Sequence, residues 1–257
     1  KLGVKESRLE VIPNGVDPEL WLPLHPNIKT IKQVAVRKRL GSDRIFLYMG
    51  RIASEKNVEA LLRSWRQVAP KGCRLVIVGD GPLRPTLESN SFSNDDNDVL
   101  WWGYESDLET KIALLQCAEV FLLPSLVEGL SIALLEAMST GTACIATDAG
   151  ADGEALEDGA GIVLSTEGVT SQLKTLLPVL KDHPLLTSEL GRRARARVLE
   201  RYTLKQNIDS LEILYRNLLE SKKSNSIKPI HDFVQQQPQQ LQSKQNVHQP
   251  FQDAVEP

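Results

Sequence analysis

The sequence predicts an α/β fold built on a doubly wound parallel sheet, followed by terminal helices. From residue 45 to about residue 165, short aliphatic runs alternate with longer segments of helical periodicity. The short runs are apolar almost without interruption, which is typical of strands covered by helices on both faces. After residue 168 the pattern is helical throughout, so we expect the sheet to end before that point.

Six strands are predicted in the alternating part of the chain, with helices between most of them. The expected strands span residues 45–50, 73–78, 99–103, 120–124, 143–147 and 161–164. The expected helices between them span residues 57–69, 82–89, 106–116 and 131–139. The aromatic pair Trp101 and Trp102 in the third strand is expected to lie in the core, and presentation of a ring to a ligand is the alternative.

Three further helices are predicted at residues 168–181, 184–200 and 203–220. The last of them carries apolar residues at spacings of three and four, which form a stripe along the helix. This stripe is expected to pack either on this domain or on a separate domain. The stripe comprises Ile208, Leu211, Leu214, Tyr215, Leu218 and Leu219. Residues 235–257 contain nine glutamines, so the tail after Glu220 is expected to be disordered.

Composition and charge exclude several classes of protein. Of the 257 residues, 41% are hydrophobic, which is enough for a packed core. The net charge of −3 offers no electrostatic case for nucleic acid as the main partner. No apolar run is long enough for a transmembrane segment. The three separated cysteines, in apolar surroundings, suit free thiols and a cytoplasmic location, with peripheral association at a membrane left open.

The loop after the first strand contains two cations, Arg51 and Lys56, that follow Gly50. Ligands of open α/β sheets bind beyond the carboxyl ends of the strands, where this loop is expected to lie. One cation leaves the strand and the other enters the helix, so both can converge on one anion beside a helix N-terminus. A pyrophosphate would fit, although two solvated surface cations would give the same pattern.

The loop after the fourth strand places Glu128 before a helix and Glu136 within it. Gly129 between them lets a ligand approach free backbone N–H groups. The two glutamates lie roughly 80° apart around a helix, so we expect them to hold two ends of one extended ligand. Glu136 is surrounded by apolar residues, and a buried carboxylate there needs hydroxyl groups or a cation as partners.

Three other loops give weaker signals. Gly103 and Tyr104 follow the third strand and could present a backbone edge to a base. The small and acidic residues 147–154 after the fifth strand are expected either to form a plain turn or to belong to the site. The segment Val78-Gly79-Asp80-Gly81-Pro82 is similar to the start of a dinucleotide fingerprint, but Arg84 replaces its third glycine, which argues against nicotinamide binding.

Five motifs, in the order in which they occur along the chain, resemble those of the retaining GT-B glycosyltransferases called group 1, or family 4. The resemblance covers about residues 9–220. The motifs are Ile12-Pro13-Asn14-Gly15-Val16-Asp17, Gly50-Arg51 with Lys56, Val76-Ile77-Val78-Gly79-Asp80-Gly81-Pro82, Phe121-Leu122-Leu123-Pro124-Ser125, and Glu128 with Glu136. In that family a Rossmann-like C-terminal domain binds the nucleotide-sugar donor, and an N-terminal domain binds the acceptor. The resemblance therefore implies that this chain is the donor half.

The same resemblance assigns roles to individual residues. It implies that Arg51 and Lys56 hold the diphosphate, that Glu136 accepts hydrogen bonds from the ribose, and that Glu128 contacts the sugar. Arg51, Lys56 and Glu128 would carry the catalytic role, without a metal ion or a cofactor. The implied donor-binding set is Gly50, Arg51, Lys56, Gly103, Tyr104, Glu128, Gly129, Leu130, Ser131 and Glu136.

The implied organisation has four parts. Residues 1–44 form an interdomain junction and lead-in, residues 45–202 a nucleotide-sugar-binding domain, residues 203–220 a terminal crossover helix, and residues 221–257 a disordered Gln-rich tail. The implied reaction transfers a hexosyl group with retention to an unknown acceptor, completed by an N-terminal acceptor domain in the same or another chain. The alternative is a nucleotide-sugar-binding module without transfer activity. Residues 149–154 depart from the family, which has a Gly-Gly pair and a proline before an acid matched by Glu154.

Overall fold

The computed structural model describes residues 5, 8–25, 27, 29–41, 43–68, 70–90 and 98–226. The chain divides into two compact units, Lys1–Ser210 and Leu211–Pro257. The sheet and all of the loops discussed above belong to the first unit. No helix of the described part is both long enough and apolar enough to cross a membrane.

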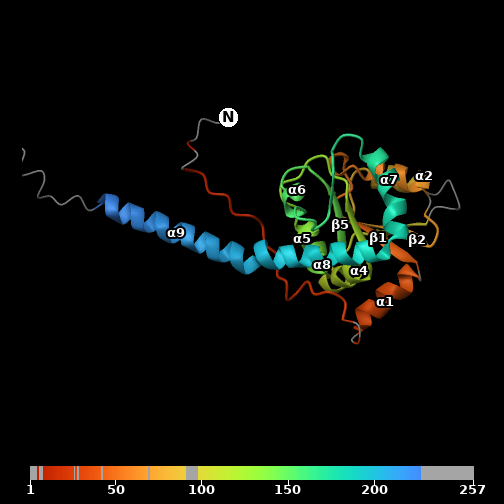
Figure 1. The fold of residues 1–257 in the computed structure, drawn as a ribbon, viewed down its shortest axis with the longest axis horizontal. Coiled ribbons are helices and arrows are strands. Elements are labelled where there is room, and N and C mark those ends of the chain that lie inside the picture. Colours follow the sequence, from red (N-terminus) through yellow and green to blue (C-terminus); the bar gives the residue numbers. More distant parts are fainter. Residues whose placement is uncertain are drawn as a thin grey trace, which may run out of the picture. The chain divides into compact units, whose positions relative to one another are not determined.

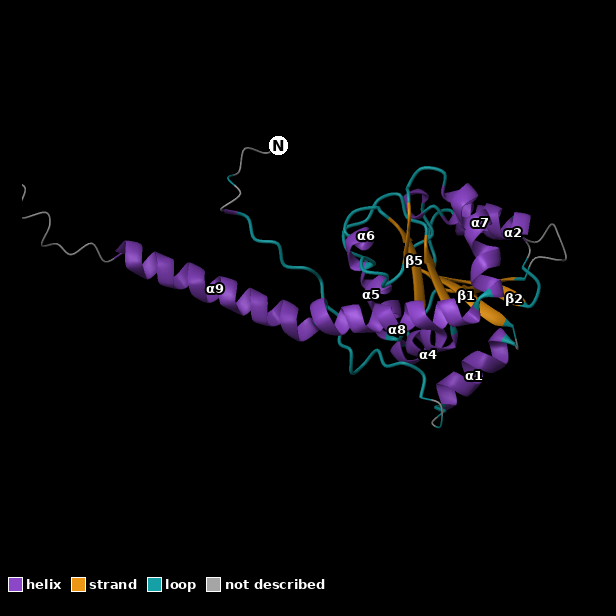
Figure 2. Cartoon of the chain, in the orientation of Figure 1, coloured by secondary structure: helices purple, strands orange, loops and turns teal. Residues whose placement is uncertain are grey.

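The first unit is built on a parallel sheet of six strands, flanked by helices (Figures 1 and 2). The strands are β1 (Arg44–Met49), β2 (Cys73–Val78), β3 (Val99–Gly103), β4 (Val120–Leu123), β5 (Ala143–Thr147) and β6 (Ile162–Leu164). Their order is β3-β2-β1-β4-β5-β6, and each pairs in parallel with its neighbours. The predicted doubly wound sheet is confirmed. The direction of strand addition reverses between β1 and β4, which is where such sheets bind ligands.

Helices precede, connect and follow the strands, and several of them pack on one another in pairs. They are α1 (Ile31–Leu40), α2 (Val58–Val68), α3 (Arg84–Ser89), α4 (Leu108–Cys117), α5 (Ile132–Ser139), α6 (Asp152–Ala155), α7 (Val169–Asp182) and α8 (Pro184–Arg201). A short 3-10 turn, η2 (Ser54–Lys56), precedes α2. Helix α2 packs on α7, α1 on α4, and α5 on α8. The core of this unit is centred on the inner strands β1, β2, β4 and β5, whose side chains are almost all buried, whereas the edge strands β3 and β6 are more exposed.

Helix α1 lies within the segment predicted as a lead-in and was missed in the sequence. Thr30 caps it: its side chain accepts the N–H of Gln33, while the Gln33 side chain accepts the N–H of Thr30. This capping box can be recognised in the sequence, but the apolar periodicity of the residues after it is weak. The helix buries Gln33, Val36 and Leu40. The lead-in is also tied to the end of α8 and the start of the helix that follows it at Val16, whose N–H donates to the Tyr202 carbonyl and whose carbonyl accepts the Leu204 N–H.

The ends of β1 and β2 approach each other closely at two glycines. Gly79 has φ +134°, and a Cβ atom there would collide with the carbonyl oxygen of Gly50. Gly50 in turn donates its N–H to the carbonyl of Val78 at 3.0 Å. The glycine after β2 therefore fixes the path by which the chain leaves β1 toward Arg51.

Helix α9 (Leu204–Ser226) follows α8 and extends six residues beyond the predicted end at residue 220. Of the predicted stripe, Ile208, Tyr215, Leu218 and Leu219 are exposed. Residues 227–257, which make up most of the predicted disordered tail, lie outside the described residues.

Candidate functional site

The loops after β1 and β4 come together at the reversal point of the sheet. Arg51 lies two residues after β1, and Lys56 ends the η2 turn. Glu128 lies between β4 and α5. The backbone joins the two loops as well, because the N–H of Leu126 donates to the carbonyl of Glu55 at 2.7 Å. The structure thus brings together the two loops that the sequence singled out.

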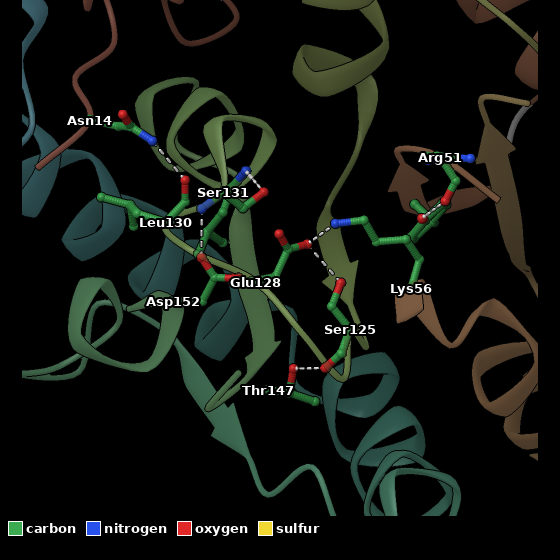
Figure 3. Close-up of polar contacts among 11 residues, drawn as sticks. Asn14, Arg51, Lys56, Ser125, Glu128, Leu130, Ser131, Thr147 and Asp152 are labelled. Carbon is green, nitrogen blue, oxygen red and sulfur yellow. Dashed lines mark hydrogen bonds and ion pairs between the residues drawn. The ribbon is translucent and has the colours of Figure 1, made fainter. Parts of the chain in front are cut away.

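Lys56 and Glu128 form an ion pair across this junction (Figure 3). Lys56 Nζ donates to Glu128 Oε1 at 2.5 Å, and the Ser125 hydroxyl donates to the same oxygen at 2.9 Å. The Ser125 carbonyl accepts a hydrogen bond from the hydroxyl of Thr147 at the end of β5. The other oxygen, Glu128 Oε2, has no partner in the described part of the chain and is free to accept a hydrogen bond.

Arg51 does not share this network. Its side chain is exposed and makes no hydrogen bond or ion pair within the described residues. In Figure 3 its guanidinium points away from Glu128, toward which the Lys56 ammonium is directed. The backbone of Arg51 is held by the buried Tyr48, whose hydroxyl donates to the Arg51 carbonyl at 2.6 Å. The two cations therefore sit on one loop, but they do not converge in this unliganded arrangement.

The N-terminus of α5 faces the same junction and is held by an acid that sequence reasoning did not single out. Ser131 caps the helix by accepting the N–H of Leu134 at 3.4 Å. The N–H of Ser131 donates to Asp152 Oδ1 at 2.8 Å. Asp152 is fully buried, its Oδ2 has no hydrogen-bond partner among the residues that the structure describes, and burial raises its pKa to about 6. The acid-rich loop after β5 was a signal for it, but the contact joins segments 21 residues apart.

Glu136 lies on α5, more than one helical turn after the Ser131 cap. It is partly buried and makes no hydrogen bond or ion pair among the residues that the structure describes. Burial raises its pKa to about 7, although the positive charge of Lys111 acts in the opposite direction. An unpaired carboxyl group in this position is costly for the folded protein, as the sequence led us to expect. It is available to accept hydrogen bonds from a ligand.

The segment after β3 has a mixed character. Tyr104 is 73% exposed, whereas the Gly103 carbonyl already accepts the Gly79 N–H at 2.8 Å. Trp101 is buried, which confirms its predicted place in the core. Trp102 is only partly buried, and its ring lies 3.8 Å from the Arg39 guanidinium. That contact leaves Tyr104 as the exposed aromatic residue of this segment.

Two further segments support the backbone between Glu128 and Ser131. Asn14 donates from Nδ2 to the carbonyl of Leu130 at 3.0 Å, which places the predicted lead-in motif beside the site (Figure 3). The N–H of Ala151 donates to the Gly129 carbonyl at 2.7 Å. Space around Gly129 itself is open, since a Cβ atom there would meet nothing within 4 Å. The described residues contain no cluster of three or more His, Cys, Asp or Glu side chains placed to hold a metal ion.

The sequence also matches a known protein family. The family model described as "Glycosyl transferases group 1" matches residues 43–182. The chain belongs to this family. Among curated relatives, it is 31% identical over 192 residues to the alpha-D-kanosaminyltransferase of Streptomyces kanamyceticus, covering 73% of the chain and 50% of the relative. It is 26% identical over 230 residues to the Escherichia coli UDP-Gal:alpha-D-GlcNAc-diphosphoundecaprenol alpha-1,3-galactosyltransferase, covering 86% and 57%. The group 1 chain thus spans about half the length of these relatives.

Solved structures share the fold of this group 1 chain. The Anabaena protein Alr3699/HepE, crystallised with UDP, has a TM-score of 0.71 at 20% identity, covering 83% of this chain and 59% of that one. A glycosyltransferase from Rickettsia africae gives 0.73 at 17% identity, with coverage of 84% and 59%. The C-terminal domain of a group 1 glycosyl transferase from Francisella tularensis gives 0.64 at 20% identity, covering 74% of this chain and 100% of that domain.

Proposed function

We propose that this chain is the donor-binding half of a retaining glycosyltransferase. It would bind a nucleotide-sugar and, when completed by an N-terminal acceptor domain, transfer a hexosyl group with retention to an acceptor. One observation carries the proposal: the Lys56–Glu128 pair joins the loops after β1 and β4 at the reversal point of the sheet. Arg51 lies on the first of these loops, and α5, which carries Glu136, begins at the end of the second. We assign Arg51 and Lys56 to a diphosphate, Glu128 and the N-terminus of α5 to a sugar, and Glu136 to a ribose.

The diphosphate would bind between Arg51 and Lys56. Arg51 has no protein partner within the described residues, so all of its donors are available to an anion. Lys56 can keep one donor on Glu128 and direct the others at a phosphate, because an ammonium group has three. Fixed positive charges of this kind stabilise a departing diphosphate without a metal ion, and we propose that no cofactor is needed.

The sugar would lie against Glu128 and the backbone from Gly129 to Ser131. Glu128 Oε1 is already occupied by Lys56 and Ser125, whereas Oε2 has no partner in the described part of the chain. That oxygen can accept a hydroxyl group of the sugar. The open space at Gly129 allows a ring to approach the backbone closely. Glu128 would thus link the sugar to the cation that holds its leaving group.

The nucleoside would extend from the diphosphate toward Glu136 and the Gly103–Tyr104 segment. Ribose hydroxyls would donate to the Glu136 carboxylate and supply the partners that it lacks in the free protein. Tyr104, with its exposed ring, would lie along the base. A structural neighbour crystallised with UDP, and a relative named for a UDP-Gal donor, make uridine diphosphate the first nucleotide to test.

The proposed reaction proceeds through an oxocarbenium-like state. The bond from the anomeric carbon to the diphosphate breaks, and the acceptor hydroxyl attacks from the face that the diphosphate leaves. The diphosphate oxygen takes the proton of that hydroxyl. Arg51 and Lys56 stabilise the negative charge that develops on the leaving group, so this half contributes mainly positioning and preorganised charge. Relatives named as kanosaminyl-, galactosyl- and mannosyltransferases support a hexosyl donor.

Calorimetric titration of the chain with UDP, GDP and ADP in the presence of EDTA tests donor binding. We expect one of the three to bind, and Arg51→Ala to weaken it while Lys174→Ala, which alters an exposed cation on α7, does not. A transfer assay with the corresponding nucleotide-sugar and an added acceptor domain then tests catalysis. Absence of nucleotide binding, or its complete loss on chelation, would contradict the proposal. Binding without transfer would leave the sugar-binding module as the function.

A further inference from the structure

Helix α1 exposes an apolar and basic face that the proposed donor site does not use. The helix buries Gln33, Val36 and Leu40 in the domain. On its outer side Ile31 is 89% exposed and Val34 is 55% exposed. At about 100° per residue, these two side chains lie on the face opposite the buried ones. Folding of this unit therefore does not explain why that face is apolar.

The outer face of α1 lies at the end of the sheet opposite the candidate donor site. Helix α1 leads into the start of β1, and the last residues of α4, Gln116 and Cys117, lead into the start of β4. The donor loops leave the other ends of the same strands. In Figure 1, α1 and α6 accordingly lie at opposite ends of the sheet. A molecule bound at α1 would not block the donor site.

A pocket opens between α1, α4 and the lead-in segment. Its volume is about 700 Å³, which falls in the range of small-molecule sites. It is lined by Leu24, Lys29, Gln33, Val34, Arg37, Lys38, Gln116 and Cys117. Three of these eight side chains are cations and none is a carboxylate. The pocket is therefore suited to an apolar chain with an anionic head.

Charge accumulates around this pocket although the whole chain carries a net charge of −3. No acid occurs between Glu19 and Asp43, and that stretch contains Lys29, Lys32, Arg37, Lys38 and Arg39. Of these cations, Lys32 pairs with Asp107 at 2.9 Å, near Glu105 and Glu109, and Arg39 stacks on Trp102. Arg37 also interacts within the chain. Lys29 and Lys38 are exposed and make no hydrogen bond or ion pair within the described residues.

We infer that this outer α1 face, comprising Leu24, Lys29, Ile31, Val34, Arg37 and Lys38, docks on an anionic phospholipid membrane. The exposed apolar side chains would enter the boundary between head groups and acyl chains. Lys29 and Lys38 would lie among the lipid phosphates, with Arg37 beside them, because clustered cations bind anionic leaflets. Because the donor site is at the other end of the sheet, it would remain open to water. This inference does not depend on the proposed glycosyl transfer.

Vesicle co-sedimentation of the full chain tests the inference. We expect binding to phosphatidylcholine vesicles that contain phosphatidylglycerol, little binding to phosphatidylcholine alone, and release at high salt. Lys38→Gln should weaken binding about fivefold, the loss expected for one cation near an anionic surface. Val34→Ser should weaken it several-fold. The matched controls on α7, Lys174→Gln and Val179→Ser, change exposed residues of the same types and should have no effect.

A second measurement reports the depth of the contact. Ile31→Trp places a fluorescent side chain on the proposed face, and Leu185→Trp on α8 places one at an equally exposed position, 86% against 89%. Brominated lipids should quench the added emission of the first variant and not of the second. The inference would be overturned if the chain failed to bind anionic vesicles, or if test and control variants lost equal amounts of vesicle binding. It would also be overturned if vesicle binding depended on Lys38 but not on Val34. The last result would describe a contact with a polyanion rather than insertion into lipid.

Discussion

Replacing Glu136 by glutamine is expected to stabilise the folded chain and, at the same time, to weaken nucleotide binding. The carboxyl group is partly buried, has no hydrogen-bond or ion-pair partner within the described part of the chain, and its pKa is raised by burial from 4.5 to about 7. A difference of that size corresponds to an upper limit of about 3 kcal/mol of lost stability once the group is ionised. Partial exposure reduces this figure, so we expect Glu136→Gln to raise the free energy of unfolding by about 1–3 kcal/mol at pH 8.

The pH dependence of this gain has a definite sign. Below the usual pKa of 4.5 the carboxyl group is protonated in both the folded and the unfolded state, so the variant gains nothing. Between that value and about 7 the folded state holds a proton that the unfolded state has released. The stability of the parent chain relative to Glu136→Gln therefore falls as pH rises through this window, and the gain is complete above it.

The affinity of the parent chain for nucleotide should rise with pH, whereas its stability relative to Glu136→Gln falls. If ribose hydroxyls donate to an ionised Glu136, binding must first remove its proton at low pH. We therefore expect the parent chain to bind uridine diphosphate about tenfold more weakly at pH 6 than at pH 8. This factor is counted after subtracting the change in affinity that Glu136→Gln shows between the same two pH values. Glu136→Gln should lose this component and should bind at pH 8 with a penalty of about 1.5 kcal/mol, typical of a hydrogen bond to a charged group.

Urea unfolding at pH 4 and pH 8, followed by circular dichroism, measures the first effect, and calorimetry measures the second. Glu167→Gln is the matched control, since Glu167 is exposed in the loop before α7 and should change neither quantity. A variant no more stable than the parent at pH 8 would refute the desolvation of Glu136. An unchanged affinity for the nucleotide would refute its assignment to the ribose.

Three further outcomes are expected. Arg51→Ala and Lys56→Ala should each weaken binding of a nucleoside diphosphate by about 1.5–3 kcal/mol in calorimetry with EDTA present, and equal affinity would exclude them as diphosphate ligands. Gly79→Ala should lower stability in urea by about 3 kcal/mol or more, because its Cβ would meet the backbone of Gly50 just after β1, whereas Gly72→Ala, also at positive φ but with open space around it, should cost about 1 kcal/mol. The chain alone should self-associate or bind a hydrophobic dye through its terminal helix at residues 203–220, and a monomer without dye binding would count against an exposed apolar stripe.

The sequence alone predicted the secondary structure of the first unit to within a few residues at most boundaries. Its apolar runs were long and uninterrupted, because strands buried on both faces tolerate few polar residues. It failed at α1, where the capping box at Thr30 was legible but the apolar residues lie on two faces of the helix. It also failed at α6, whose four residues are too short to show a period.

For the candidate site, the sequence determined which loops and which side chains to consider. Parallel strands place their carboxyl ends at one edge, so Arg51, Lys56 and Glu128 could be assigned to loops at that edge, and Glu136 to the helix after one of them, before any strand order was known. Only the tertiary structure decided that β1 and β4 are adjacent, that Lys56 pairs with Glu128 across 72 residues, and that Asp152 holds the N–H of Ser131. The physical reason is that periodicity along the chain reports which face of an element is buried, whereas contacts between loops depend on strand order and register, which no local pattern encodes.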